Sequence, residues 1–345
     1  MLLQEQVPLA PRTTLGVGGA ARWLTDVGEE GALLEAVGFA RERRLPLFVL
    51  GGGSNLVVAD EGFPGLVVHI ALLGMTRVES RFQVGAGVIW DDFVAQAVAL
   101  NHGGIECLAG IPGTVGGTPV QNVGAYGQEV SATIEQVRVL DLTSLEFLQM
   151  PASMCGFAYR RSVFNSTERG RYVVTRVDYR LQKDAAPTLV YADLQRHFRD
   201  RPEAPTLAET AAAVRAIRHG KGMLLADGDP DCRSAGSFFK NPVVPQALYD
   251  ALAAAEAIAP PFYPAHPGFV KIPAAWLLEH AGFPKGFAMG RAGISSRHTL
   301  ALINRGGATT REIVALRDCI VAGVEKQFHI HLEPEPVWLG PKPID

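Results

Sequence analysis

Two clusters of small residues are the positions in this sequence whose types and spacing could do chemistry. The first, Gly51 to Asn55, reads GGGSN, and the second, Gly110 to Gly117, reads GIPGTVGG. Neighbouring glycines leave backbone N–H groups exposed, and such groups can bind phosphate oxygens. The spacing matches neither a P-loop nor the GxGxxG fingerprint. One such loop alone is more often an ordinary tight turn, but two of them could grip a diphosphate from opposite sides.

The segment after the second cluster, Pro119 to Gly127 (PVQNVGAYG), adds amide side chains to a stretch that has almost no charge. Amides beside apolar surface suit a flat heterocycle that needs orientation more than charge. The alternative is a buried turn whose backbone is satisfied by its own Gln121 and Asn122. These patterns alone leave both interpretations open.

The composition excludes several classes of protein. The chain has 345 residues, and its 48% hydrophobic content can bury a full core, which argues against disorder. Its 32 Lys and Arg against 35 Asp and Glu give a net charge of −3 without a basic block, so we expect no nucleic-acid or membrane-surface partner. No apolar run reaches the ~18–20 residues of a membrane helix, and the N-terminus shows no export signal. We therefore expect a cytoplasmic protein.

The four cysteines, Cys107, Cys155, Cys232 and Cys319, are far apart and form no CxxC pair. This usage is typical of reduced thiols in a cytosol-like compartment. We expect neither a disulfide framework nor a metal site.

The hydrophobic pattern of the N-terminal half predicts alternating helices and strands that end in glycine turns. Helix periodicity covers 31–44, and short apolar runs of strand length cover 45–50 and 66–70. A strand and glycine turn at 82–87 lead into an amphipathic helix at 88–100. The first glycine cluster therefore follows directly on a predicted strand.

The rest of the chain changes character twice. The glycine-rich stretch 103–127 has no steady period, whereas 134–142 and 172–181 alternate as strands. A polar, proline-containing stretch suggests a boundary near residue 205. Beyond it we predict a helix from 206 to about 221 and another in the alanine-rich stretch 247–259.

Four motifs occur in one order along the chain. They are PGTVGG with PVQNVGAYGQE, then Tyr159-Arg160-Arg161-Ser162, then GSFFKNP from Gly236, and finally Leu332-Glu333-Pro334-Glu335. With them, the sequence from about Thr13 to Gly340 closely resembles the MurB family, the UDP-N-acetylenolpyruvoylglucosamine reductases, in the type I form that has a tyrosine loop.

The resemblance implies an α+β fold. A two-lobe FAD-binding region of the vanillyl-alcohol-oxidase (PCMH) type would occupy 1–70 and 71–205, and an α/β substrate-binding domain would occupy 206–345. It also implies non-covalent FAD, NADPH as hydride donor, and UDP-N-acetylenolpyruvoylglucosamine as the substrate that is reduced to UDP-N-acetylmuramate during peptidoglycan precursor synthesis. We expect a monomeric enzyme, a UDP-N-acetylmuramate dehydrogenase.

The resemblance also implies three catalytic residues. Arg160 would bind and polarise the substrate carboxylate, since a planar guanidinium can form two parallel bonds to it. Ser237 would be the proton donor, and Glu335 would assist at the enolate carbon and carboxylate. From the residues alone, Arg160 could equally be a surface arginine and Ser237 an ordinary turn serine.

For the substrate, the resemblance implies Tyr159, Tyr191, Lys221, Asn241 and His298. Fifteen residues separate Lys221 from Ser237, more than in many relatives, so the alignment of Lys221 depends on where the gap is placed. His298 could instead be a histidine at a helix start or in the core.

For FAD, the resemblance carries over positions from both glycine clusters and from the amide segment. They are Gly51, Gly52, Gly53, Ser54, Asn55, Ile111, Pro112, Gly113, Thr114, Gly116, Gly117, Gln121, Asn122 and Gly127.

Two other functions stay open. The glycine clusters alone would allow an FAD-dependent oxidase or dehydrogenase of another small substrate, although GSFFKNP and the terminal EPE argue against it. A nucleotide-binding regulatory protein that has lost chemistry would have no reason to keep Arg160, Ser237 and Glu335 together.

Overall fold

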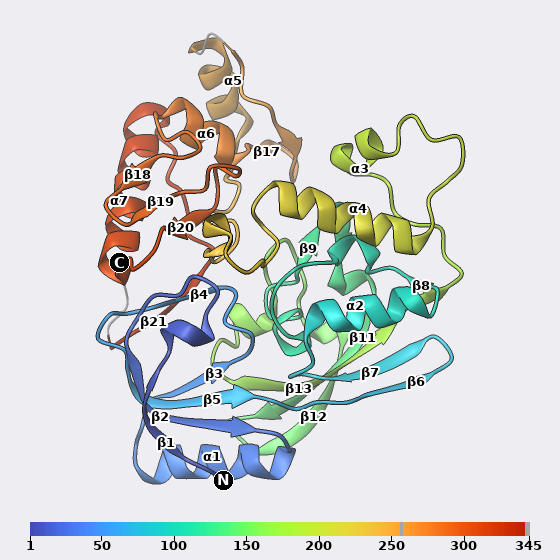
Figure 1. Cartoon of the computed structure of the whole chain (residues 1–345), viewed down its shortest axis with the longest axis vertical. Coiled ribbons are helices and arrows are strands. Elements are labelled where there is room, and N and C mark those ends of the chain that lie inside the picture. Colours follow the sequence, from blue (N-terminus) through green and yellow to red (C-terminus); the bar gives the residue numbers. More distant parts are fainter. Residues whose placement is uncertain (256–257, 342–345) are drawn as a thin grey trace. The chain divides into compact units, whose positions relative to one another are not determined.

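The structure is a computed structural model that describes residues 1–255 and 258–341, and in it the chain folds into two compact units (Figure 1). The first unit comprises Met1–Val7, Ala21–Gly53 and Pro64–Gly220. The second comprises Pro8–Ala20, Ser54–Phe63 and Lys221–Asp345. Each unit thus combines segments that are far apart in the sequence. The finer division at residues 70 and 205 stays a prediction.

A four-stranded sheet in the first unit has the strand order β1-β2-β5-β3. Its strands are β1 Gln4–Pro8, β2 Ala20–Val27, β3 Leu47–Leu50 and β5 Phe63–Ile70. Helix α1 (Glu30–Glu42) packs on it, because Leu33, Ala36, Val37 and Ala40 recur at helical spacing and are buried. The predicted helix at 31–44 and the strands at 45–50 and 66–70 are confirmed.

A five-stranded antiparallel sheet in the same unit has the order β12-β11-β13-β7-β6. Its strands are β6 Met75–Val78, β7 Arg81–Gly85, β11 Ile134–Asp141, β12 Glu146–Pro151 and β13 Tyr172–Arg180. Three further helices of this unit are α2 Trp90–Ala99, α3 Ala192–His197 and α4 Leu207–Gly220, and α4 contacts both α2 and α3 (Figure 1). The predicted strands at 134–142 and 172–181 and the helices at 88–100 and from 206 are confirmed.

The glycine-rich stretch 103–127 and its surroundings contain only short elements. The two-residue strands are β8 His102–Gly103, β9 Gly124–Ala125, β10 Gln128–Glu129 and β14 Gln182–Lys183. Within this stretch the 3₁₀ turns are Glu106–Leu108 and Val115–Gly117. Elsewhere in the described residues they are Ala10–Arg12, Val130–Ala132, Ala152–Met154, Val163–Asn165 and Pro230–Cys232. This agrees with the absence of a steady period there.

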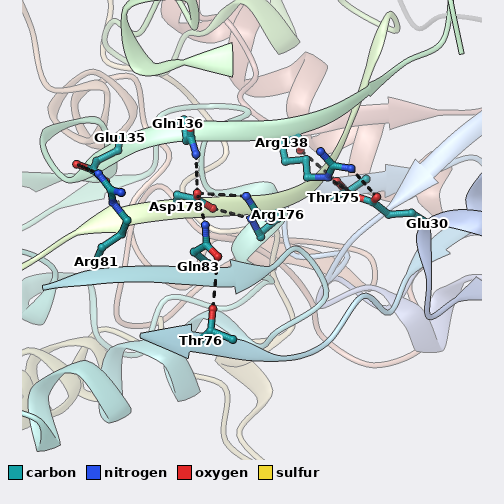
Figure 2. A network of polar contacts seen from close by, with 10 residues as sticks. All are labelled: Glu30, Thr76, Arg81, Gln83, Glu135, Gln136, Arg138, Thr175, Arg176 and Asp178. Carbon is teal, nitrogen blue, oxygen red and sulfur yellow. Dashed lines mark hydrogen bonds and ion pairs between the residues drawn. The ribbon is translucent and has the colours of Figure 1, made fainter. Parts of the chain in front are cut away.

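A polar network links the first turn of α1 to the five-stranded sheet (Figure 2). Arg138 of β11 donates Nε and Nη2 to the two carboxylate oxygens of Glu30, at 2.7 and 2.9 Å. Thr175 of β13 donates its hydroxyl to Glu30 at 2.9 Å. This arrangement joins elements that lie more than 100 positions apart in the chain.

Further along the same network, the buried Asp178 carboxylate accepts hydrogen bonds from three neighbours (Figure 2). They are Gln83 at 2.9 Å, Gln136 at 2.7 Å and Arg176 at 2.7 Å. A buried carboxylate is tolerated when it is satisfied in this way. The polar side chains of this network therefore hold the fold of the first unit.

The second unit is built from short strands and three helices of the described chain. The strands are β4 Leu56–Val58, β15 Val243–Pro245, β16 Tyr263–Pro264, β17 Phe269–Lys271, β18 Ala288–Met289, β19 Ala292–Ile294, β20 Leu302–Asn304 and β21 Val337–Leu339. The helices are α5 Gln246–Ala255, α6 Ala274–His280 and α7 Thr310–Phe328. The predicted helix at 247–259 ends at Ala255, and its residues 256–257 lie outside the described residues.

Helix α7 carries much of the core of this unit. Its buried positions include Ile313, Leu316 and Ile320, and a capping box between Thr309 and Glu312 fixes its start. β21 pairs in parallel with β4, which brings the end of the described chain beside residues 56–58.

All four cysteines are free; Cys107, Cys155 and Cys232 are buried, and Cys319 is exposed. Within residues 1–255 and 258–341, no helix has the length and apolar character needed to cross a bilayer.

Candidate functional site

The two glycine clusters, which lie about 60 residues apart in the sequence, meet in space. A Cβ built on Gly52 would lie 2.6 Å from the Cα of Gly113, and one built on Gly51 would lie 2.9 Å from the Oγ1 of Thr114. The backbones of the two loops are thus in direct contact, and no side chain fits at position 52. The pairing of loops on which the diphosphate interpretation depended is present.

The backbone amides of these loops have the donor chemistry that FAD requires. Within the described residues, the N–H groups of Gly52, Gly53, Gly113 and Thr114 donate no hydrogen bond to the protein. Gly53 and Gly113 have φ values of 63° and 125°, which favour glycine. Amides left open in neighbouring loops fit the oxygens of a diphosphate, so the residues present fit the cofactor.

Arg218 of α4 adds positive charge beside the second glycine cluster, and the sequence analysis missed it. It is buried, and its Nε donates to the Gly110 carbonyl at 3.1 Å. Burial lowers the pKa of the guanidinium, and the neighbouring Tyr126 and Asp91 act in the opposite direction. Nothing in the pattern RAIRHGK distinguishes this arginine from its neighbours, because only the packing of α4 buries it.

Several residues of the second cluster and the amide segment have structural contacts of their own. Asn122 is buried, its Nδ2 donates to Glu129 at 3.0 Å and to the Ala158 carbonyl at 3.1 Å, and its Oδ1 accepts from the Ser131 amide. A Cβ on Gly116 would lie 2.6 Å from that of Ala86. Asn122 therefore satisfies the backbone of a buried turn, as the alternative interpretation of this segment required. Its role toward FAD stays a prediction.

Gly117 differs from Gly116, because a Cβ at Gly117 would have no atom within 4 Å among the described neighbours. Ile111 and Pro112 are partly exposed, as is Gln121. These positions leave room for a ligand beside the loop, and their contacts with FAD stay predictions.

Arg160 lies against the amide segment of the first unit. Its Nη1 donates to the Gly124 carbonyl at 3.0 Å, and its guanidinium carbon lies 5.5 Å from the ring centroid of Tyr159. Its backbone φ of 53° is left-handed, a conformation that non-glycine residues seldom adopt. Arg160 is half-buried whereas Arg161 is exposed, so the structure distinguishes two arginines that are equivalent in the sequence.

In the second unit, the backbone of one residue, Phe238, joins three of the predicted site segments. The amide of Phe238 donates to the Leu300 carbonyl at 2.7 Å, and the carbonyl of Phe238 accepts from the Glu335 amide at 2.8 Å. Ser237 directly precedes this residue, and His298 lies in the turn that presents Leu300. The structure therefore brings the segments of Ser237, Glu335 and His298 together although they are distant in sequence.

Asn55 supports the Glu335 segment from its other side. Its Nδ2 donates to the Glu335 carbonyl at 3.3 Å, and its own carbonyl accepts from the Val337 amide at 2.9 Å. The sequence analysis assigned Asn55 to FAD, which stays a prediction; the contacts present connect it to Glu335 and to Val337, the first residue of β21.

The two terminal glutamates have different surroundings. Glu333 is exposed and forms an ion pair with Lys240 at 3.1 Å, whereas Glu335 is half-buried. The two phenylalanines after Ser237 are both buried and pack edge to face at 5.5 Å. They fix the backbone on which Ser237 and the Glu335 segment depend.

The remaining predicted substrate residues have varied local roles. Asn241 Oδ1 accepts from the Ala274 amide at 2.9 Å, at the start of α6. His298 Nδ1 lies 3.3 Å from the Leu300 amide, which makes Nδ1 the acceptor and places the proton of the neutral ring on Nε2. Lys221 is the first residue of the long segment of the second unit. Substrate binding by these residues stays a prediction.

The loop between Lys221 and Ser237 is held by acidic residues that the sequence analysis did not single out. Arg297, next to His298, forms ion pairs with Asp229 and with Asp231, the latter at 2.9 Å. The Arg297 guanidinium holds the pKa of the Asp229 carboxyl below its usual range. For Asp231, burial would raise the pKa, but hydrogen bonds from Ser296 and Arg297 outweigh it. This pairing gives the long loop a defined path beside His298.

Two family matches cover both ends of this arrangement. Residues 24–144 match the FAD binding domain family, and residues 229–339 match the C-terminal domain of UDP-N-acetylenolpyruvoylglucosamine reductase. The fold and its paired glycine loops therefore define a flavoprotein with a second, reductase-type domain.

Similar proteins identify the family. The chain is 46% identical to UDP-N-acetylenolpyruvoylglucosamine reductase of Thermobifida fusca, over 97% of this chain and 98% of that one. It is 44% identical to the reductase of Streptomyces coelicolor, over 97% and 90%. The crystal structure of the reductase (MurB) from Thermus caldophilus matches with a TM-score of 0.69 and 28% identity, over 98% of this chain and all of that one. The chain belongs to the UDP-N-acetylenolpyruvoylglucosamine reductase family.

These findings confirm the predicted family, the α+β fold class and the FAD-binding region. In the described part of the chain, no group of three or more His, Cys, Asp and Glu side chains is arranged to hold a metal ion.

Proposed function

We propose that this chain reduces UDP-N-acetylenolpyruvoylglucosamine to UDP-N-acetylmuramate, with NADPH as hydride donor and FAD as cofactor. Membership of the reductase family over nearly the whole chain is the observation that carries this proposal. When bound, FAD supplies the hydride transfer from NADPH to the enolpyruvyl group. The paired loops, which meet at Gly52 and Gly113, would hold it non-covalently through backbone amides.

Arg160 receives the carboxylate of the enolpyruvyl group. Addition of hydride to C3 develops negative charge on C2 and on this carboxylate, so a fixed cation there stabilises the transition state. The contacts of Arg160 with Gly124 and with the Tyr159 ring fix the guanidinium before substrate arrives. A guanidinium held in one orientation can donate two parallel N–H hydrogen bonds to the carboxylate.

Ser237 delivers the proton to C2, and Glu335 assists at the carbon that becomes protonated. The hydroxyl of Ser237 makes no hydrogen bond within the described residues, which leaves it available to a ligand. The backbone of Phe238 ties the segment of Glu335 and the turn of His298 to the residue next to Ser237. General acid catalysis needs this kind of fixed placement.

Tyr159, Tyr191, Lys221, Asn241 and His298 bind the UDP-sugar. The side chain of Asn241 keeps its NH₂ group for a ligand while its oxygen holds α6. Tyr191 is 42% exposed, so its ring can contact a substrate. The protonated Nε2 of His298 can donate a hydrogen bond.

The enzyme works as a monomer in the cytoplasm, in the synthesis of peptidoglycan precursors and hence in cell shape and division. The free, mostly buried cysteines support a reducing compartment. The balanced charge supports small-molecule rather than nucleic-acid partners.

An anaerobic absorption experiment tests the proposal. Purified protein should show the two flavin bands, lose the long-wavelength band with NADPH, and recover it when UDP-N-acetylenolpyruvoylglucosamine is added. Bleaching without recovery would remove the substrate assignment, and a protein that cannot be reconstituted with FAD would remove the cofactor. Fast recovery with oxygen in place of the UDP-sugar would favour an oxidase on the same fold.

A further inference from the structure

A fully buried carboxylate lies beneath the segment that carries Tyr191. Glu106 has no exposed surface. Its Oε1 accepts from the Thr188 amide at 2.9 Å, and its Oε2 accepts from the Gly104 amide at 2.8 Å. The carboxylate thus connects two stretches that are more than 80 positions apart in the chain.

Gln128 completes this contact from the glycine-rich side. Its Nε2 donates to Glu106 at 2.8 Å and to the Thr188 hydroxyl at 3.1 Å, and its Oε1 accepts from the Cys107 amide at 2.8 Å. The Cys107 thiol lies 3.2 Å from the Thr188 carbonyl, to which it donates. Burial raises the pKa of this thiol, so it keeps the proton that it donates. All three polar groups of Thr188 are therefore held.

Beyond Thr188 the side chains are more exposed. Val190 is 67% exposed and Tyr191 is 42% exposed. A Cβ at Gly127 would lie 2.2 Å from the Val190 side chain, and the Tyr191 ring packs edge-on against Tyr126 at 5.1 Å. The Tyr191 segment, residues 184–191, thus has a fixed base and an exposed end that rests on the amide segment.

We infer that Glu106 is a positioning residue for substrate binding, because it fixes the base of the Tyr191 segment to the glycine-rich stretch. The inference rests on the proposed function, in which Tyr191 contacts the UDP-sugar. A buried carboxylate is costly unless its oxygens accept hydrogen bonds, and the Thr188 amide supplies one of the three that Glu106 accepts, beside those of Gly104 and Gln128. The ring of Tyr191 is then presented from one position, so less conformational freedom is lost when substrate binds.

The test compares Glu106→Gln with wild-type holoenzyme. A glutamine has one carbonyl oxygen, so its NH₂ group must face either the Gly104 amide or the donors from Thr188 and Gln128. Substrate affinity, measured from the change in flavin absorption during titration with UDP-N-acetylenolpyruvoylglucosamine, should fall about ten-fold, as expected for loss of a hydrogen bond to a charged acceptor. Tryptic cleavage after the exposed Arg196 and Arg199 should accelerate, while flavin reduction by NADPH keeps its rate.

Asp178→Asn is the matched control, because Asp178 is another buried carboxylate of the same unit that accepts hydrogen bonds without touching the Tyr191 segment. This variant should lose stability yet keep substrate affinity and the slow cleavage pattern. Equal effects of the two variants on affinity and cleavage would overturn the inference and make Glu106 an ordinary core residue. Faster cleavage with unchanged affinity would also overturn it.

A milder variant decides the matter if Glu106→Gln does not fold. Thr188→Val removes only the hydroxyl that Gln128 contacts and should weaken substrate binding about three-fold, within the range for one neutral hydrogen bond. Full affinity in this variant would overturn the inference. Failure of the proposed function is recognised separately, because the wild-type holoenzyme would then show no spectral response to the UDP-sugar. The cleavage comparison would still show whether Glu106 fixes the base of the Tyr191 segment.

Discussion

The first unit offers a ligand mainly its backbone, and the second offers mainly side chains. In the first, the glycine loops touch so closely that position 52 excludes any side chain, and open amides line them. In the second, the candidate groups are a serine, a glutamate and a histidine whose segments are held by the peptide of Phe238. Arg160, Tyr159 and Tyr191 are the exceptions, because they are side chains of the first unit that the proposed function places at the substrate.

This difference separates two kinds of sensitivity to substitution. A backbone site is lost when a side chain is added, because the added atoms displace the loops. A side-chain site is lost when the reacting group is removed, although the fold remains. We therefore expect added side chains in the glycine loops of the first unit to affect cofactor content, and removal of the reacting groups of the second unit to affect chemistry at unchanged cofactor content.

The largest expected effect follows from Ser237→Ala. Reoxidation of the reduced flavin by UDP-N-acetylenolpyruvoylglucosamine should slow about a thousand-fold, in the range for loss of a general acid. Stopped-flow absorption should show that reduction by NADPH and the FAD content are unchanged. Loss of FAD from this variant would break the proposed separation between the units.

Glu335→Gln should slow the same half-reaction by about a hundred-fold, in the range for loss of a group that assists proton transfer. Glu333→Gln provides the control, since Glu333 is exposed and only pairs with Lys240. The measurement is again reoxidation in single turnover. Similar reoxidation rates for the two variants would contradict the catalytic role that is proposed for Glu335 and not for Glu333.

Gly52→Ala tests the backbone site of the first unit. The added methyl group would meet the Gly113 backbone, so FAD affinity should fall about ten-fold or more, given the 1–3 kcal/mol typical of overpacking. Equilibrium dialysis of FAD measures this. Gly38→Ala in α1 is the control, because its Cβ has open space and the change should slightly stabilise the helix. Full FAD affinity in Gly52→Ala would contradict the role assigned to the loop contact.

The smallest expected effect concerns the polar network of Figure 2. Hydrogen bonds from Arg138 and Thr175 hold the pKa of Glu30 below its ordinary value of 4.5. Its stabilising contribution is therefore complete above that value and is lost as pH falls through the lowered pKa.

Glu30→Gln should lower the free energy of unfolding by about 1 kcal/mol near neutral pH. The difference from wild type should shrink in acid, and the FAD content of the folded protein should stay unchanged. Urea unfolding near neutral pH and at a pH below the lowered pKa of Glu30 measures this. An equal difference in unfolding free energy between variant and wild type at both pH values would show that the ionised Glu30 contact does not cause the effect.

Much of the fold could be predicted from the sequence where local pattern decides it. The periodicity of 31–44 predicted α1, and the alternation of 134–142 and 172–181 predicted β11 and β13. The short strands β4 and β16, and the exchange of segments such as 54–63 between units, had no comparable signal. Strands of two or three residues are too short for a period to be recognised.

The candidate site divides in the same way. The sequence by itself indicated candidate residues for chemistry, because the motifs around Gly113, Arg160, Ser237 and Glu335 resemble those of one enzyme family. The comparisons confirm that family, and the roles of the residues stay predictions.

Only the tertiary structure decided that Gly52 meets Gly113, that Asn55 supports the Glu335 segment, and that Glu106 holds Thr188. These contacts join residues tens to hundreds of positions apart. Their formation depends on how sheets and loops pack, and no local pattern of residue types records that packing.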